Sequence, residues 1–216
     1  MNTITTEPAF RFHYVLRAVA NALETPVVII LILLMLAAVA LLGWLLAELF
    51  GERRHLKVKL PQMLDEIQAR SRPITEIISG SGLLRSQKAA LLELTQHPEF
   101  TPATREALSV RLLEQEQARY DGIVKLSEYV SRLGPMFGLL GTLIPLGPGI
   151  IALGQGDTQT LSMSLLTAFD TTIAGLAAAA VTTVISTIRK AWYKDYISIL
   201  ELLSEGILEA LKEDIT

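Results

Sequence analysis

Three long stretches that are almost free of charge constrain this chain more than any other feature of its sequence. They cover residues 25–47, 133–154 and about 158–188, and Asp170 is the only charged residue within them. A helix that rises about 1.5 Å per residue needs about 20 apolar residues to cross the hydrocarbon core of a bilayer. Each stretch is long enough. The sequence therefore predicts an all-α membrane protein with three transmembrane helices.

Basic residues near the ends of these spans predict the orientation of the chain. Lys and Arg concentrate on the cytoplasmic side of membrane proteins. Arg53, Arg54, Lys57 and Lys59 follow span one, Arg132 precedes span two, and Arg189, Lys190 and Lys194 follow span three. We therefore expect a cell (inner) membrane protein with its N-terminus outside and its C-terminus in the cytoplasm. The predicted segments are an external segment at 1–24, span one at 25–49, a cytoplasmic helical region at 50–132, span two at 133–154, an external turn at 155–157, span three at 158–188 and a cytoplasmic helix at 189–216.

The start of span one and the residues before it carry separate signals. Thr25 suits a helix N-cap, and Pro26 suits the first helical position, where its missing amide hydrogen costs nothing. Upstream, Phe10, Tyr14 and Arg17 recur at helical spacing. These three residues are compatible with an amphipathic helix lying on the outer leaflet or with a frayed terminus.

Apolar residues at helical spacing continue outside the spans. In the cytoplasmic region they predict a helix broken at Pro73, a second helix that ends near Pro98, and a long helix that Thr101 caps. No strong breaker separates this long helix from span two. The same periodicity runs on after span three. We therefore expect spans two and three to extend as long helices into the cytoplasm.

Several classes of function lack the residues they need. The chain has no cysteine, and His13, His55 and His97 have no metal-ligand spacing. No phosphate-binding loop, dinucleotide fingerprint or catalytic triad pattern is present. The formal net charge of -3 gives no electrostatic footprint for nucleic acid. We expect no enzyme activity, no metal, no cofactor and no nucleic-acid partner.

The polar residues of span three raise the question of function. An aspartate in the middle of a membrane costs about 2.5–3.5 kcal/mol on insertion scales, and the spans contain no Lys, Arg or His to pair with Asp170. Its carboxyl group must be protonated, hydrated or matched by another subunit. Two interpretations follow: Asp170 is part of an ion or proton path, or it makes a structural hydrogen bond to a neighbouring subunit.

A helical projection separates Asp170 from the other polar residues of span three. At about 100° per residue, Thr172 and Thr183 share a face with the small residues Gly175 and Ala179. Asp170 lies about 160° away from Thr172 on the same projection. Small residues allow helices to approach closely and hydroxyls hydrogen-bond between helices, so this face suits helix packing as well as a pore.

Span two carries a matching set of small residues. Gly134, Gly138, Gly141, Pro145 and Gly149 recur at spacings of three or four, with Thr142 beside them. This face would allow a close helical neighbour. Pro145 and Pro148 each remove a backbone hydrogen bond, so we expect a break near the outer end of span two, of the kind that marks a pathway.

The motifs of these two spans resemble a known family. GLLGTL at 138–143 and TTIAGLAAAA at 171–180 resemble the MotA/TolQ/ExbB proton channel family, and the three-span topology is similar to its ExbB/TolQ branch. The resemblance implies a homopentamer around a dimer of a single-span partner similar to ExbD or TolR, which carries a membrane aspartate. It also implies that ion flow drives rotation and force. The two pore threonines of the family map onto Thr142 and Thr172.

The full set of candidate residues combines the projection with the resemblance. Thr142, Thr172, Thr183 and Asp170 are the candidates for the ion pathway, and Gly138, Gly141, Pro145, Gly175 and Ala179 are the candidates for the helix-packing or pore face. Asp170 has no counterpart in the family pattern. The alternatives are a structural membrane scaffold without ion conduction, a flagellar MotA-like stator and a solute permease, although the inverted repeats of a permease are not seen. Both H⁺ and Na⁺ remain open as the ion, as does the process that the ion flow powers, including protein transport.

Overall fold

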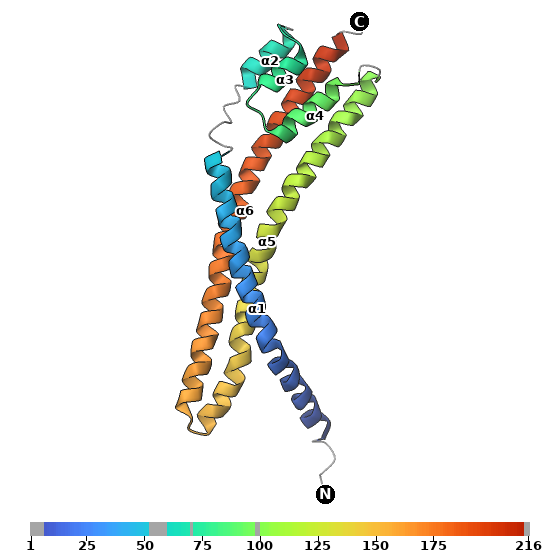
Figure 1. Ribbon diagram of the computed structural model, residues 1–216. Helices are drawn as coiled ribbons and strands as arrows, with labels where there is room; N and C mark the ends of the chain where they lie inside the picture. The colour runs from blue at the N-terminus through green and yellow to red at the C-terminus, as the bar shows by residue number, and fades with distance from the viewer. Residues whose placement is uncertain (1–6, 52–59, 70, 98–99, 214–216) are drawn as a thin grey trace. The chain divides into compact units, whose positions relative to one another are not determined.

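The computed structural model describes residues 7–51, 60–69, 71–97 and 100–213. Within these ranges the chain forms helices and no strand. The helices are α1 (Glu7–Gly51), α2 (Leu60–Gln68), α3 (Ile74–Gly80), α4 (Arg85–Thr95), α5 (Pro102–Gly154) and α6 (Thr158–Glu213) (Figure 1). Helices α1, α5 and α6 are long and apolar enough to cross a membrane. The all-α membrane class with two long final helices is confirmed.

Two of the sequence interpretations rest on residues that the structure leaves out. The side chains of Phe10, Tyr14 and Arg17 lie outside the described part of the chain, as do Arg53, Arg54, Lys57 and Lys59.

The backbone of residues 7–51 is described and forms a single helix. The predicted helix start at Thr25 is therefore wrong, because α1 continues through Pro26. Proline at this point removes only the hydrogen bond to the Ala22 carbonyl, and the rest of the helical ladder stays in place.

Helix α5 corrects a second expectation. We predicted a break at Pro145 and Pro148, but α5 is continuous from Pro102 to Gly154 and contains both prolines as well as Pro135. The prolines remove single hydrogen bonds without ending the helix. Since a proline has no amide hydrogen, the carbonyl oxygens of Gly141 and Ile144 lack their usual donor four residues later. Span two therefore keeps its helical path and gains two backbone acceptors.

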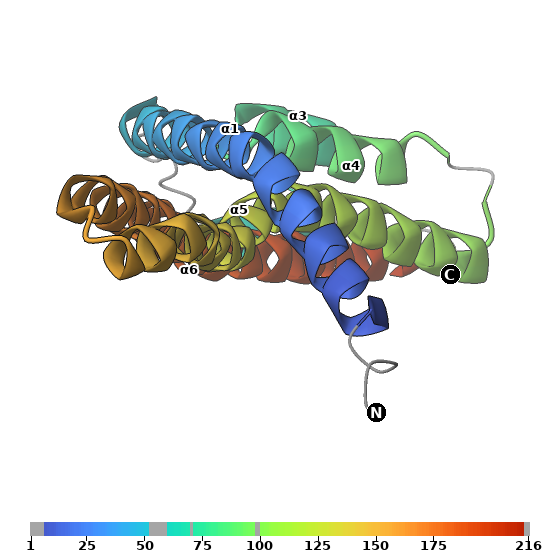
Figure 2. The same ribbon diagram turned by 90° about the horizontal axis from the view of Figure 1, so that it is seen from below.

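The chain divides into two compact units. The first, here the hairpin unit, comprises Met1–Gly43 and Ser127–Ile185, and the second, here the core unit, comprises Trp44–Leu126 and Ser186–Thr216. In the hairpin unit, α5 and α6 run antiparallel and side by side in both views (Figures 1 and 2). One face of α1 is buried, with its buried residues three or four apart: Val27, Leu31, Leu34, Ala38 and Leu41. Its other apolar side chains, such as Leu33 and Leu36, are exposed and suit contact with lipid.

A tight turn connects α5 and α6. Gly156 has a φ of 77°, a left-handed conformation that glycine adopts without steric cost. Asp157 then caps α6, because the Thr160 amide donates to its Oδ1 at 3.0 Å and the Thr160 hydroxyl donates to its Oδ2 at 2.5 Å. Only three residues, 155–157, separate the two helices. The turn therefore fixes the antiparallel register of the hairpin.

The core unit has its own hydrophobic centre. Short helices α2, α3 and α4 contribute Ile67, Ile78 and Leu91, and the final part of α6 contributes Leu203 and Ile207. These five side chains are 1% exposed or less, so the tail of α6 is a core element and not a solvated extension. Burial of this kind contributes about 1.5–3 kcal/mol for each large apolar side chain.

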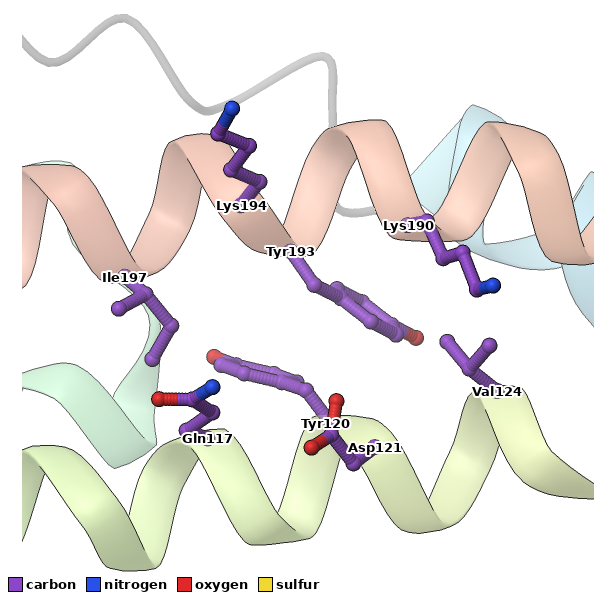
Figure 3. Close-up of a pocket in the computed structure, with 8 residues that line it drawn as sticks. All are labelled: Gln117, Tyr120, Asp121, Val124, Lys190, Tyr193, Lys194 and Ile197. Carbon is purple, nitrogen blue, oxygen red and sulfur yellow. The ribbon is translucent and has the colours of Figure 1, made fainter.

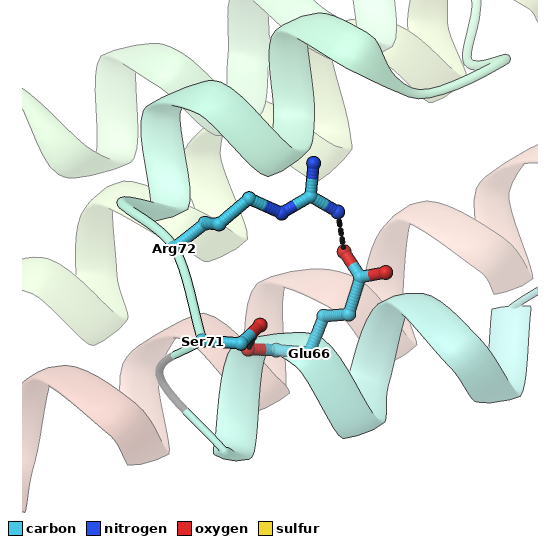
Figure 4. A network of polar contacts seen from close by, with 3 residues as sticks. All are labelled: Glu66, Ser71 and Arg72. Atoms are coloured by element: carbon cyan, nitrogen blue, oxygen red, sulfur yellow. Dashed lines mark hydrogen bonds and ion pairs between the residues drawn. The ribbon is translucent and has the colours of Figure 1, made fainter.

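Polar contacts order the connections around this centre. The chain turns between α2 and α3 just before Pro73, where Arg72 Nη2 lies 2.6 Å from Glu66 Oε2 (Figure 4). The buried Gln87 side chain donates to the Tyr196 carbonyl at 3.0 Å and accepts from the Leu84 amide at 3.1 Å, which ties the start of α4 to α6. The predicted Thr101 cap is confirmed, since its hydroxyl accepts the Thr104 amide at 3.3 Å.

Candidate ion pathway in the membrane hairpin

The glycine face of span two packs directly against span three. A Cβ atom added to Gly134 would lie 2.5 Å from the Gly175 carbonyl oxygen and 3.3 Å from the Ala179 Cβ. One added to Gly175 would meet the Gly134 carbonyl oxygen equally closely. Side chains at these two positions would force the backbones apart. The small residues of both spans therefore allow α5 and α6 to pack backbone to backbone.

This contact continues toward the turn and includes a threonine. A Cβ at Gly138 would lie 3.5 Å from the Thr172 Cα, and one at Gly141 would lie 2.6 Å from the Thr171 Cβ. Thr171 is buried and its hydroxyl donates to the carbonyls of Thr167 at 3.0 Å and Ala168 at 2.9 Å. Pro145, farther along α5, is also buried. We call the line of contact through Gly134, Gly138, Gly141, Thr171 and Gly175 the hairpin seam.

The helical projection placed Thr172 on the same face of span three as Gly175 and Ala179, but the seam covers only part of that face. Gly175 and Ala179 lie in the seam, where Ala179 is 7% exposed. Leu176 on the other edge is 53% exposed, and Thr172 between them is half-buried. Gly138 and Gly141 also lie in the seam. Four of the five small candidate residues are therefore covered by the other helix of the hairpin. Thr172 lies at the edge of this contact, next to the exposed surface of α6.

The antiparallel register brings three of the four polar candidates to one depth. Because Gly141 contacts Thr171, the next residue toward the turn on each helix, Thr142 on α5 and Asp170 on α6, lies at the same level. Thr172 is one residue farther from the turn than Thr171, so all three fall within about 3 Å along the helix axes. Thr183 is about three turns, or about 16 Å, farther along α6 from Thr172. It does not join this level.

The candidate threonines use their hydroxyl protons within their own helices. Thr142 donates to the Leu139 carbonyl at 2.7 Å, Thr172 to Ala168 at 3.2 Å and Thr183 to Ala179 at 2.7 Å. Such back-bonding lets a hydroxyl sit in an apolar helix at little cost. It also leaves the lone pairs of each oxygen free of these bonds. At the level of Thr142, the Gly141 carbonyl adds a further acceptor because Pro145 supplies no amide.

Asp170 is placed differently from the threonines. Its side chain is exposed, and no hydrogen bond or ion pair joins it to any residue in the described part of the chain. The carboxyl group thus faces outward at the level of Thr142. Within one copy of the chain nothing compensates its charge, so water, an ion or a second polypeptide must do so if it is buried in the membrane.

Sequence reasoning missed two features of the polar residues. Thr171 and Thr182 were not among its candidate residues, but Thr171 lies in the seam and Thr182 is fully buried, donating to the Ala178 carbonyl at 2.8 Å. The glycine spacing of span two was a usable signal, since small residues on one helix call for a close neighbour. The glycine spacing alone does not show which side of span three packs against span two.

Sequence reasoning also treated Arg189 as a basic flank of span three, whereas it is fully buried in the core unit. Its Nη2 lies 3.3 Å from Glu48 Oε2, and its guanidinium lies 4.8 Å from the centre of the Trp44 ring. Tyr193 donates to Glu48 Oε1 at 3.3 Å. Burial raises the pKa of the Tyr193 hydroxyl and the charge of Glu48 raises it further, so the hydroxyl stays protonated and remains a donor.

The candidate residues of the hairpin offer threonine hydroxyls, a backbone carbonyl without its usual donor and one carboxyl group. In the described residues no group of three or more His, Cys, Asp or Glu could hold a metal ion. A search of curated proteins found no match. The model of the MotA/TolQ/ExbB proton channel family matches residues 83–202, which is more than half of the chain and includes the whole seam. This multi-pass membrane protein belongs to the MotA/TolQ/ExbB proton channel family.

Proposed function

We propose that the chain is the channel, or stator, subunit of an ion-driven membrane motor. In this proposal five copies surround a dimer of a single-span ExbD/TolR-like protein, in the inner membrane, with the N-terminus outside and the C-terminus in the cytoplasm. Proton or sodium flow past the partner's membrane aspartate drives rotation of one component against the other. The family match and the three membrane-spanning helices support this assembly.

The observation that carries the proposal is the common depth of Thr142 on α5 and Thr172 on α6, the two helices that the hairpin seam joins. The seam holds α5 and α6 at a fixed separation through backbone contacts. Neither threonine is buried by it. Two oxygen atoms with free lone pairs therefore lie at one level of a rigid two-helix wall. A wall of this kind suits a moving partner helix, because it offers polar contacts without a fixed charge.

The chemistry follows from the hydrogen bonds. While its proton is donated to its own helix, each threonine oxygen can accept a hydrogen bond from a protonated carboxylic acid or coordinate Na⁺. When the partner's acid loses its proton, rotation of the threonine hydroxyl lets it donate to the carboxylate instead. A change from the accepting to the donating state breaks one hydrogen bond between the threonine hydroxyl and its own helix, worth about 0.5–1.5 kcal/mol. The hydroxyls can therefore serve both states of the partner's carboxyl group.

Two finer roles stay proposals within this mechanism. We place Asp170 in the ion path because it is exposed at the level of Thr142, and Thr183 as a second polar contact farther along α6. The alternative without ion conduction is a scaffold in which the seam only packs helices. The backbone contacts of the seam favour that alternative as far as Gly134 and Gly175 are concerned. The seam contacts do not explain why Thr142 and Thr172, which the seam leaves only half-buried, carry hydroxyl groups.

The test uses the purified complex with the single-span protein that co-purifies with the chain, reconstituted in liposomes that contain a pH-sensitive dye. The double change Thr142→Val and Thr172→Val keeps side-chain volume and removes both hydroxyls. We expect ion flux to fall to the level of empty liposomes. Thr167→Val is the matched control, because Thr167 is exposed and back-bonded to Met163 at 3.0 Å but lies outside the proposed path. Unchanged flux in the double variant would overturn the channel mechanism and leave the scaffold.

A further inference from the structure

The core unit contains a hollow that the ion pathway does not use. Its volume is about 460 Å³, and its lining comes from the last turns of α1, the first turn of α4, and facing turns of α5 and α6. All of these segments belong to the core unit. The residues that give it chemical character are Trp44, Arg85, Ser86, Arg119 and Tyr120. They come from three different helices, and Tyr193 and Tyr196 of α6 complete the lining, so the fold and not a local motif brings them together.

The charges around this hollow favour an anion. Arg85 makes no ion pair with any described residue, and Arg119 has only a long contact of 3.7 Å to Glu116. Glu48 is the acidic residue of the lining, and the buried Arg189 compensates its charge. Among the described residues of the lining, Arg85 therefore leaves a positive excess once these pairs are taken into account. Arginine is well suited to bind phosphate, because its planar guanidinium presents parallel N–H donors.

One residue of the same lining, Tyr120, carries an uncommitted hydrogen-bond donor. Tyr120 is 7% exposed, and its hydroxyl makes no hydrogen bond of acceptable geometry, although the Ser86 hydroxyl is near enough to lower its pKa. Burial outweighs this contact and raises the pKa of Tyr120, so the group stays a neutral donor. A buried hydroxyl without a partner costs about 1–3 kcal/mol, which a ligand in the hollow would recover.

The start of α4 supplies backbone amide donors in addition to the Tyr120 hydroxyl. Leu84 precedes the helix, and its apolar side chain cannot accept a hydrogen bond from the first turn. The amides of Arg85 and Ser86 have no acceptor within the helix. They lie at the positive end of the 11-residue helix α4, and Arg85, Ser86 and Tyr120 all line the hollow. Anions bind at such helix starts when a side chain supports them.

The other side of the hollow is apolar. Trp44 is 52% exposed and belongs to the last turns of span one, and Ala47 and Ile123 also line the hollow. Tryptophan concentrates at the boundary between membrane and water, where one side of its ring is apolar and the other is wet. The lining therefore suits a ligand that has an anionic head and an apolar part.

A second hollow that shares two lining tyrosines with the first adds to the positive field. Tyr120 and Tyr193 stack with ring centres 4.5 Å apart and line both the first hollow and a second one of about 200 Å³ (Figure 3). Lys190 and Lys194 line this second hollow from α6, and Asp121 is its acidic residue. Two cations against one anion raise the local positive potential, which attracts anions to the region.

We propose that the hollow between Trp44, Arg85, Arg119 and Tyr120 binds a phosphate-bearing ligand with an apolar part. The ligand chemistry has two sources, an anionic membrane lipid or a soluble organic phosphate. In either case the phosphate contacts Arg85, Arg119 and the start of α4, and the apolar part contacts Trp44. The proposal does not depend on ion conduction, because binding is measured without a partner protein or an ion gradient.

The experiment follows the fluorescence of Trp44 in the full chain, purified in a non-ionic detergent. The sequence has two tryptophans, so Trp192→Phe leaves Trp44 as the single reporter, and circular dichroism checks that the helices are retained. The probes are short-chain phosphatidylglycerol, short-chain phosphatidylcholine with no net charge, and glycerol 3-phosphate, which has no acyl chain. We expect a saturable signal from phosphatidylglycerol and a much weaker one from phosphatidylcholine. Saturation by glycerol 3-phosphate at equal affinity would assign the site to soluble phosphates, and its failure would assign it to lipid.

Variants connect the signal to the hollow. Arg85→Gln and Arg119→Gln should each weaken binding by about fivefold or more, and Tyr120→Phe should weaken it while keeping the ring stack. Arg111→Gln is the matched control, since Arg111 is an exposed arginine of α5 with a similar long contact of 3.9 Å to Glu114 and lies outside the lining. No saturable binding by any probe, equal binding of phosphatidylcholine, or an equal loss in Arg111→Gln would overturn the proposal.

Discussion

Arg189 is fully buried, and the carboxylate of Glu48 lies 3.3 Å from its Nη2 atom. The two residues stand at the ends of spans one and three, 141 positions apart in the chain, and both belong to the core unit. Neither Arg189 nor Glu48 Oε2 makes a further hydrogen bond of good geometry. Each charge therefore depends on the other, with the Trp44 ring as additional support for the guanidinium.

We predict that Glu48→Ala is strongly destabilising. Removal of one partner from a buried ion pair leaves an uncompensated charge and costs about 3–5 kcal/mol. The measurement is the thermal unfolding midpoint of the purified chain in detergent, compared with Glu114→Ala, which removes an exposed partner of Arg111. The double variant Glu48→Gln and Arg189→Met removes both charges and should recover most of the loss. A double variant as unstable as Glu48→Ala would contradict this account.

The hairpin seam gives a prediction about glycine. Gly175→Ala places a methyl group against the Gly134 carbonyl oxygen, a backbone atom that cannot rotate away. We expect a loss of about 1–3 kcal/mol in the free energy of unfolding, as in other overpacked sites. Gly147→Ala is the control on the same hairpin, because nothing lies within 4 Å of its added Cβ. Since alanine favours a helix more than glycine does, Gly147→Ala should be neutral or stabilising.

The turn between spans two and three gives a pH-dependent prediction. Hydrogen bonds from the Thr160 hydroxyl and amide lower the pKa of Asp157. A carboxyl group whose pKa is depressed by folding stabilises the protein above its unfolded pKa of about 3.9, and this contribution is lost as pH falls through the folded value. Thermal midpoints of the wild type and of Asp157→Ala should therefore differ at neutral pH and converge in acid. A constant difference at all pH values would exclude the cap as its cause.

The sequence was sufficient to predict the class of the fold because span length and charge are local properties. The apolar runs that contain Leu33 or Leu139 read as membrane helices without any knowledge of their neighbours. Helix ends were less predictable. Pro145 and Pro148 suggested a break, but one missing amide leaves the other hydrogen bonds of the ladder in place, so α5 continues. The low helix propensity of proline therefore does not by itself predict whether a helix ends at that residue.

Side-chain environments were harder to predict than helices, because they depend on contacts far apart in the sequence. Thr171 and Thr172 are adjacent and chemically identical, yet one is buried in the seam and the other lies on its edge. Only the position of Gly141 on the other helix decides between them. Arg189 likewise looked like one more basic residue after a span. Its burial depends on Glu48 and Trp44, which the chain brings close only when it folds.

The last prediction concerns Asp170, which faces outward at the level of Thr142 and has no partner in the described part of the chain. If its carboxylate carries or attracts ions, Asp170→Asn keeps shape and hydrogen-bonding capacity but removes the charge. We expect the variant to assemble with its partner protein to the wild-type mass and to lose most of its ion flux in liposomes. Asp121→Asn, an exposed aspartate of α5 outside the membrane hairpin, is the control and should conduct normally. Loss of assembly in Asp170→Asn would instead assign the residue to a structural hydrogen bond between subunits.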